Sequence, residues 1–347
     1  MEHAAGIQLS QKWSTMSLSQ QIRCIDSIYR KLKEVVDIEF PDYGSMYFAH
    51  TLLEAASKRS LDQEFCIGPH CGSRGDLASY CDGLVDVAVS RIPPVNVAPQ
   101  NLRRYHGSVP MHLHLLEFGR TVLNSMSKDH RIQSAATPTL FHPDLHKRNI
   151  FVSDDDPTVI TSIIDWQSAS IEPAFWYADE VPDFAITSPH PSFENQLKPN
   201  SKQCAKAFEI CTQFHLPKLA SPRAMDEALF RPFRYCYRTW KDGAVAFRHD
   251  LDKTSERWQE LGLVGSCPYP APTSEEMATH QKEYKYFEAT HDLKNYLTGF
   301  LNTASDGWVP LEEWETVKLA NRELFEIMLE TVQSIENPED DELVKDE

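Results

Sequence analysis

Four residues between positions 140 and 166 have types and spacing suited to phosphoryl transfer. The run FHPDLHKRN places His142, Asp144 and Asn149 in the order H-x-D-x-x-x-x-N, and Asp165 follows 16 residues after Asn149. Phosphoryl transfer needs a carboxylate that orients the attacking hydroxyl and oxygen ligands that hold Mg²⁺ against nucleotide phosphates. Asp144 is therefore a candidate catalytic base, and Asn149 and Asp165 are candidate metal ligands.

The sequence around these residues predicts a loop followed by a β-hairpin. Pro138 and Pro143 oppose a continuous helix through the motif. Residues 150–152 and 159–166 are rich in β-branched side chains and flank the polar turn SDDDP, a pattern typical of two strands around a turn. Such a hairpin would return Asp165 to the side of the loop. The competing interpretation is that the loop residues only cap turns, as Asp and Asn often do.

The rest of the chain predicts mainly helices. Ser17–Gln20 and Thr273–Glu276 form capping boxes ahead of apolar positions at helical spacing. Helical patterns also cover residues 111–126 and most of the chain beyond residue 200. Gly, Pro and Ser interrupt every pattern between 41 and 110, so an irregular segment is expected over 65–105. The expected fold class is α+β, mostly α. The last predicted helix carries an apolar stripe of Trp314, Val317, Leu324, Phe325, Met328 and Val332.

The segments HPDLHKRNIFV, IIDWQSASIEP and RPFRYCYRTWKDGAVAFRH together resemble the aminoglycoside phosphotransferase and choline kinase family. Within it they look like the fungal branch known as altered inheritance of mitochondria protein nine. The resemblance implies a protein-kinase-like fold. Residues 1–335 would form its C-terminal lobe, with a small catalytic-loop β-hairpin, and residues 336–347 an acidic disordered tail. It also implies ATP as phosphoryl donor, Mg²⁺ as cofactor and a small molecule with a hydroxyl as acceptor.

The same resemblance implies a role for each site residue. Asp144 resembles the family's catalytic base, Asn149 and Asp165 its metal ligands, and His142 the residue that braces the loop. Glu2 resembles a nucleotide-contacting hinge residue. The glycine-rich loop, strand Lys and helix Glu that grip the phosphates would precede that hinge, and no counterpart occurs in this sequence. We therefore expect a weak or inactive phosphotransferase. The alternative is a non-catalytic, pseudokinase-like binding or scaffold protein.

Composition narrows the classes of partner and compartment. The net charge of -17 and pI near 5.3 argue against binding nucleic acid or anionic lipid through bulk electrostatics. Eight scattered cysteines indicate reduced thiols inside a cell. No apolar run reaches the roughly 18 residues that a membrane span needs. The family resemblance implies a mitochondrial location, whereas the first residues lack a presequence pattern and taken alone indicate the cytoplasm.

Two further groups of residues have competing interpretations. Cys66, His70, Cys71 and Cys81 are close enough in sequence for a zinc site, although their spacing is not that of a zinc finger. The aromatic side chains of Arg234–Trp240 could line a substrate site, but packing into a helical core is the favoured interpretation.

Overall fold

The computed structural model describes residues 3–48, 59–61, 64–68, 76–97, 103, 105–187, 200–304 and 307–334. The chain divides into two compact units. The larger unit comprises Met1–Ala98, Ser108–Ile186 and Asn200–Ala271, and the smaller unit comprises the remaining residues. Helices predominate over short strands, which confirms the α+β, mostly α class. Glu2 and the predicted acidic tail lie outside the described residues.

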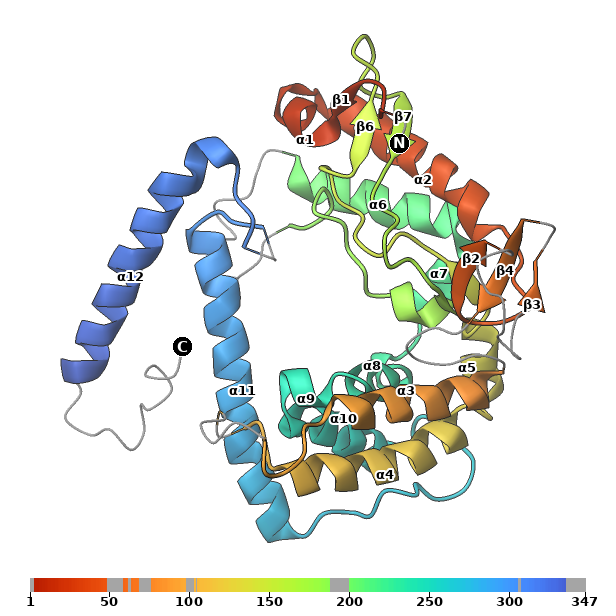
Figure 1. Cartoon of the computed structure of the whole chain (residues 1–347), viewed down its shortest axis with the longest axis vertical. Coiled ribbons are helices and arrows are strands. Elements are labelled where there is room, and N and C mark those ends of the chain that lie inside the picture. The colour runs from red at the N-terminus through yellow and green to blue at the C-terminus, as the bar shows by residue number, and fades with distance from the viewer. Residues whose placement is uncertain are drawn as a thin grey trace. The chain divides into compact units, whose positions relative to one another are not determined.

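Helix α2 (Leu18–Val36) begins at the predicted capping box. The Gln20 amide donates to the Ser17 hydroxyl, and the Ser17 amide donates to Gln20 Oε1 at 2.9 Å. One face of α2 is buried through Cys24, Ile25, Ile28, Tyr29, Leu32 and Val36. That face packs against α6 (Ser201–His215), which runs beside α2 in Figure 1.

Short antiparallel strands surround the segment that carries the motif. The order of the first sheet is β1 (Ile7–Gln8), β6 (Ile150–Val152) and β7 (Ile160–Ile163), so the predicted hairpin is confirmed. Strand β5 (Pro138–Leu140) pairs with β8 (Ile171–Pro173). A third sheet contains β2 (Ser45–Phe48), β4 (Phe65–Gly68) and β3 (Arg59–Ser60), with β4 in the middle.

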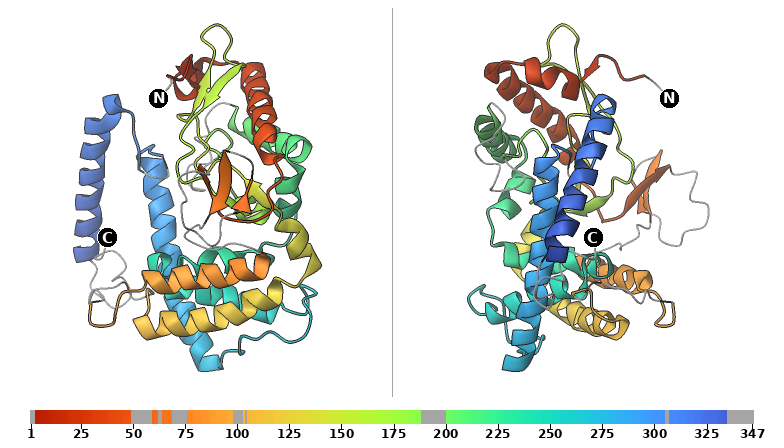
Figure 2. Two further views of the ribbon diagram at one scale, coloured as in Figure 1. Left: turned by 45° about the vertical axis from the view of Figure 1, so that its right-hand side comes forward. Right: turned by 90° about the vertical axis from the view of Figure 1, so that its left-hand side faces the viewer.

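A second helical core lies around α3 (Leu77–Arg91) and α4 (Val109–Met126), which run side by side in Figure 2. Helices α8 (Arg231–Cys236) and α10 (Ala244–Glu256) pack against them. The expectation of an irregular 65–105 segment was wrong for α3. Asp76 caps this helix by accepting from the Ser79 amide at 2.9 Å, and its buried residues recur at helical spacing: Leu77, Tyr80, Cys81, Leu84, Val85 and Ala88.

The described part of the larger unit also contains the short α-helices α1 (Leu9–Lys12), α5 (His130–Ala135), α7 (Pro217–Arg223) and α9 (Thr239–Asp242). Tyr235 and Tyr237 pack against the second core, and Cys236 is fully buried. These contacts favour the core interpretation of the aromatic segment over a substrate-site lining.

The smaller unit contains α11 (Ser274–Phe300) and α12 (Trp314–Ser334). The predicted capping box at Thr273 and Glu276 begins α11. The apolar stripe of α12 is incompletely covered, because Trp314 and Phe325 remain about half exposed. Within the described ranges, none of the helices has the length and apolar character of a membrane span.

Candidate active site

Strand pairing places two distant loops next to each other. Leu140, at the end of β5, pairs with Ile171 at the start of β8. Ile150, at the start of β6, pairs with Ile163 at the end of β7. The 141–149 loop and the 164–170 loop therefore run between the same two pairs of strands. This arrangement brings the predicted catalytic loop and the segment with Asp165 together.

His142 joins the two loops through both ring nitrogens. Its Nε2 donates to the Ile164 carbonyl at 2.7 Å, and its Nδ1 accepts from the Asp144 amide at 3.1 Å. A carbonyl can only accept and an amide can only donate, so these partners define the neutral Nε2–H tautomer. The ring is 1% exposed and packs edge-on against Trp166. His142 thus connects the two loops from a buried position.

Asn149 makes a second connection between the loops. Its side-chain Nδ2 donates to the Asp144 backbone carbonyl at 3.0 Å, and its backbone carbonyl accepts from the Ile164 amide at 2.9 Å. The Asp144 and Ile164 backbones are therefore each bonded to both His142 and Asn149. With Nδ2 committed to the loop, Oδ1 is the atom of the Asn149 amide that could bind a cation.

Asp165 comes directly after Ile164 in the chain and has an unusual backbone conformation. Its φ is 66°, in the left-handed region that Asp and Asn tolerate better than most non-glycine residues. The residue is exposed. The neighbouring Ile164 is fixed by its hydrogen bonds to His142 and Asn149. The exposed carboxylate of Asp165 is therefore held on a fixed backbone and is suited to bind a cation.

The Asp144 carboxylate has a partner that the sequence reasoning missed. His146 Nε2 lies 3.1 Å from Asp144 Oδ2, while the Asp144 side chain remains 66% exposed. The second nitrogen of His146, Nδ1, is buried without a hydrogen-bond partner among the described residues. Arg148 Nη2 lies 3.4 Å from the same Nε2 and can only donate to it, so this nitrogen is shared between Asp144 and Arg148. The signal for His146 was its position two residues after Asp144 in the same short loop.

One ion pair and two further hydrogen bonds hold the outer side of the loop. Lys147 binds Asp183 through its backbone amide at 3.0 Å and through Nζ at 2.9 Å. The Lys147 carbonyl accepts from the Ser10 amide at 3.2 Å, and the Arg148 carbonyl accepts from Gln8 Nε2 at 3.1 Å. The loop is thus held by contacts from two separate parts of the chain, residues 8–10 and Asp183.

Two groups near the loop have shifted pKa values, and the Asp144 charge acts on both. Burial lowers the pKa of His142, and the nearby Asp144 and Asp165 charges act in the opposite direction. Desolvation by the surrounding protein raises the pKa of Glu180. The Arg238 charge opposes this rise, and the Asp144 charge adds to it. Both site carboxylates therefore lie within electrostatic reach of His142, and a third carboxylate is close to Asp144.

The donor set suits a hard cation. Carboxylates of Asp144 and Asp165 and the amide oxygen of Asn149 are the oxygen ligands that Mg²⁺ prefers. The neutral His142 is occupied by two backbone bonds, so it does not compete as a ligand. Of the predicted site residues, the structure brings together the loop residues, and Glu2 lies outside the described part.

The proposed Cys/His zinc group is only partly described. Cys66 lies in β4 and Cys81 in α3, and both are fully buried. His70 and Cys71 lie outside the described residues. Cys81 Sγ donates to the Leu123 carbonyl at 3.8 Å, which is the role of a packed core thiol.

Comparisons with known proteins give weak similarity. The chain is 24% identical over 229 residues to a subtelomeric hrmA-associated cluster protein of Aspergillus fumigatus. The matched region is 51% of this chain and 44% of that relative. A protein of the same description from a second strain matches at 24% over 228 residues. No family model matches the chain, and no solved structure matches it. The chain therefore aligns with less than half the length of the curated relatives.

Proposed function

We propose that the larger unit binds Mg²⁺ and the phosphates of ATP at the loop of Asp144, Asn149 and Asp165. In this proposal a phosphoryl group passes to the hydroxyl of a small molecule. The observation that carries the proposal is the set of four hydrogen bonds that ties the Asp144 and Ile164 backbones to His142 and Asn149. Such bonds preorganise charged groups before a ligand arrives.

Each residue has a distinct part in this proposal. Asp144 accepts the proton of the attacking hydroxyl, and its Oδ2 lies beside His146 Nε2. Asn149 Oδ1 and the Asp165 carboxylate would hold Mg²⁺, which neutralises phosphate charge when bound. Asp144 is two-thirds exposed, so a hydroxyl can approach it from solvent.

Turnover of the Asp144→Asn variant tests the proposal. A positioned base contributes roughly 10²- to 10⁴-fold to the rate, so phosphate release from ATP with Mg²⁺, in the presence of candidate amino alcohols and sugars, should fall by at least about 100-fold. Circular dichroism should stay unchanged, because the contacts that hold the Asp144 backbone are kept. An unaffected rate would reject Asp144 as the base.

The non-catalytic alternative gives a different result in a binding assay. A ligand that binds the native state raises its melting temperature by mass action. If millimolar ATP with Mg²⁺ shifts the melting temperature and no acceptor is phosphorylated, the chain is a nucleotide-binding protein without transferase activity. If the melting temperature does not respond at all, the loop does not bind nucleotide and the proposal fails.

A further inference from the structure

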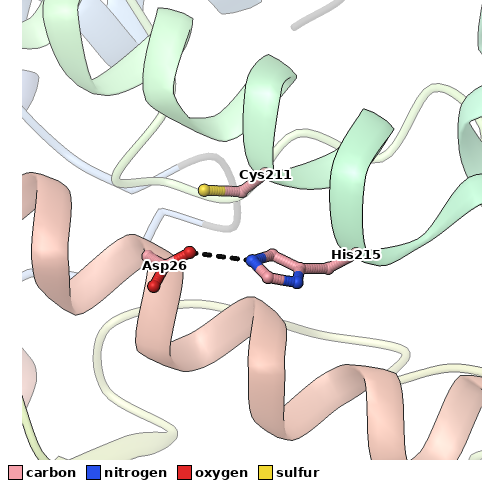
Figure 3. A group of neighbouring side chains, drawn as sticks. All are labelled: Asp26, Cys211 and His215. Atoms are coloured by element: carbon pink, nitrogen blue, oxygen red, sulfur yellow. Dashed lines mark hydrogen bonds and ion pairs between the residues drawn. The ribbon is translucent and has the colours of Figure 1, made fainter.

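Three potential metal ligands meet where α2 packs against α6, on residues that the phosphotransfer proposal does not use. Asp26 projects from α2, and Cys211 and His215 project from α6. One ligand atom from each lies within 4.8 Å of the other two. Figure 3 shows the Cys211 thiol and the His215 ring on the same side of α6, both facing Asp26. We propose that these three side chains form a binding site for Zn²⁺.

The spacing of the ligands follows from helix geometry. Cys211 and His215 are four residues apart, which puts both side chains on one face of a helix. Asp26 comes from the opposite helix and meets His215 Nε2 at 2.8 Å through Oδ1. In a tetrahedral zinc site the ligand atoms lie about 2.0 to 2.3 Å from the metal and therefore about 3.3 to 3.8 Å apart. The existing spacings reach these values through changes of about 1 Å, which small side-chain rotations can supply.

The donor types select the class of metal. A thiolate, an imidazole and a carboxylate are the ligands that Zn²⁺ takes in proteins, with a fourth position left for water. Mg²⁺ and Ca²⁺ require oxygen ligands, so they are poor candidates for this group. Cys211 and His215 are buried and the Asp26 side chain is 37% exposed, which leaves the open position on the solvent side.

Arg30 gives Asp26 an outer partner. Its Nε lies 2.7 Å from Asp26 Oδ2, so Oδ2 faces Arg30 while Oδ1 faces the other two ligands. Partners of this kind orient metal ligands. Burial of Asp26 raises its pKa, but the hydrogen bonds from His215 and Arg30 outweigh this and keep the pKa below its ordinary value. The carboxylate is thus charged and aimed at the site.

A nucleophilic Cys–His pair does not fit the same geometry. Figure 3 shows the ring nitrogen of His215 that does not face Asp26 pointing away from Cys211. Burial and the Asp26 charge raise the pKa of the Cys211 thiol to about 11. Neither nitrogen of His215 serves the thiol as a base, because one faces Asp26 and the other points away, whereas a bound metal displaces the thiol proton.

The experiment is a metal titration of the full chain after chelator treatment, without nucleotide. Zn²⁺ should bind in a 1:1 ratio against a chromophoric competitor. Co²⁺ in its place should give a sulfur-to-cobalt charge-transfer band and the strong visible bands of a tetrahedral ion. Cys211→Ser and His215→Gln should each weaken Zn²⁺ binding at least tenfold, and Cys211→Ser should remove the charge-transfer band.

Matched controls separate this site from the others. Cys204→Ser removes another buried thiol from the same helix and should leave the Co²⁺ spectrum unchanged. Asp165→Asn should leave Zn²⁺ binding unchanged, so failure of the phosphotransfer proposal does not affect this one. The proposal is overturned if no Zn²⁺ binds or if Cys211→Ser binds Zn²⁺ as tightly as the wild type. It is also overturned if binding is lost only in Cys71→Ser, a variant of the other Cys/His group. Circular dichroism of each variant identifies those that fail to fold. If Cys211→Ser and His215→Gln do not fold, Asp26→Asn, at the partly exposed ligand, should weaken Zn²⁺ binding, and unchanged binding would overturn the proposal.

Discussion

Replacing His142 by Ala should loosen both loops of the candidate active site. The substitution leaves the Ile164 carbonyl and the Asp144 amide without their ring partners, whose bonds measure 2.7 and 3.1 Å. A fully buried group left without its partner costs about 1 to 3 kcal/mol, and both of these bonds are partly buried. Water can reach the exposed edge of the loop at Asp144, so we expect the lower part of the combined range, about 2 to 4 kcal/mol.

Hydrogen exchange followed by mass spectrometry measures this loss locally. A change of about 2 kcal/mol corresponds to about 30-fold faster exchange when local opening controls the rate. Peptides that cover residues 141–150 and 160–166 should show this acceleration. Helices α2 and α6 should exchange as in the wild type, because His142 does not contact them through either ring nitrogen.

Two further variants make the measurement specific. His142→Asn can still accept from the Asp144 amide at the position of Nδ1, but its short side chain cannot reach the Ile164 carbonyl, so it should give an intermediate acceleration. His114→Ala removes an exposed histidine from α4 and should change neither peptide. If His142→Ala exchanges within about threefold of the wild type in both peptides, His142 does not brace the loops and the reasoning fails.

Three other predictions concern the backbone, the core and pH. Asp165 has a positive φ, so Asp165→Ala should destabilise the chain by about 1 kcal/mol relative to Asp165→Gly in thermal melts; equal melting temperatures would contradict the strain. A Cβ on Gly119 would lie 2.6 Å from the fully buried ring of Phe247, so Gly119→Ala should cost about 1 to 3 kcal/mol in urea unfolding, and an unchanged midpoint would show that the ring can move. Burial raises the pKa of Asp250 from 3.8 to about 6 against the opposing pull of Arg231. The folded chain then holds a proton that the unfolded chain has released, so the wild type should lose up to about 3 kcal/mol relative to Asp250→Asn as the pH rises from 4 to 6 and stay level above that; a difference independent of pH would refute the assignment.

The helix starts and the hairpin could be predicted because their signals are local. The capping boxes at Ser17 and Thr273 need only four consecutive residues. The hairpin of β6 and β7 spans 14 residues, from Ile150 to Ile163, and its two strands are joined by one turn. Such features form from neighbouring residues, so composition and spacing are enough to indicate them.

Helix α3 was missed although its signal is present. Its buried residues, from Leu77 to Ala88, recur at three- and four-residue spacing behind the Asp76 cap. Apolar residues such as Val89 on the outer side, Gly83 inside and the glycines before the helix obscure this period. The pairing of β5 with β8 joins residues more than 30 positions apart, and short strands of this kind have no marker in the sequence.

The candidate site was predicted as a set of residues, and its connections were not. The motif identified His142, Asp144, Asn149 and Asp165 by type and spacing. The bond from His142 to Ile164 depends on strand pairing that the motif does not encode. The contact between Asp26 and His215 joins residues 189 positions apart, so only the packing of α2 on α6 reveals it.

The number of Mn²⁺ ions bound in place of Mg²⁺, measured by electron paramagnetic resonance with a non-hydrolysable ATP analogue, tests the central claim most directly. We expect one Mn²⁺ bound per chain, in addition to the Mn²⁺ that the analogue binds without the protein. Asp165→Asn, which tolerates the same backbone, should weaken this binding at least tenfold. Asp154→Asn, an equal change of charge in the exposed turn of the hairpin, should leave it intact. No bound ion in the wild type, or equal binding by the Asp165→Asn variant, would contradict the claim that this loop holds a divalent ion against nucleotide phosphates.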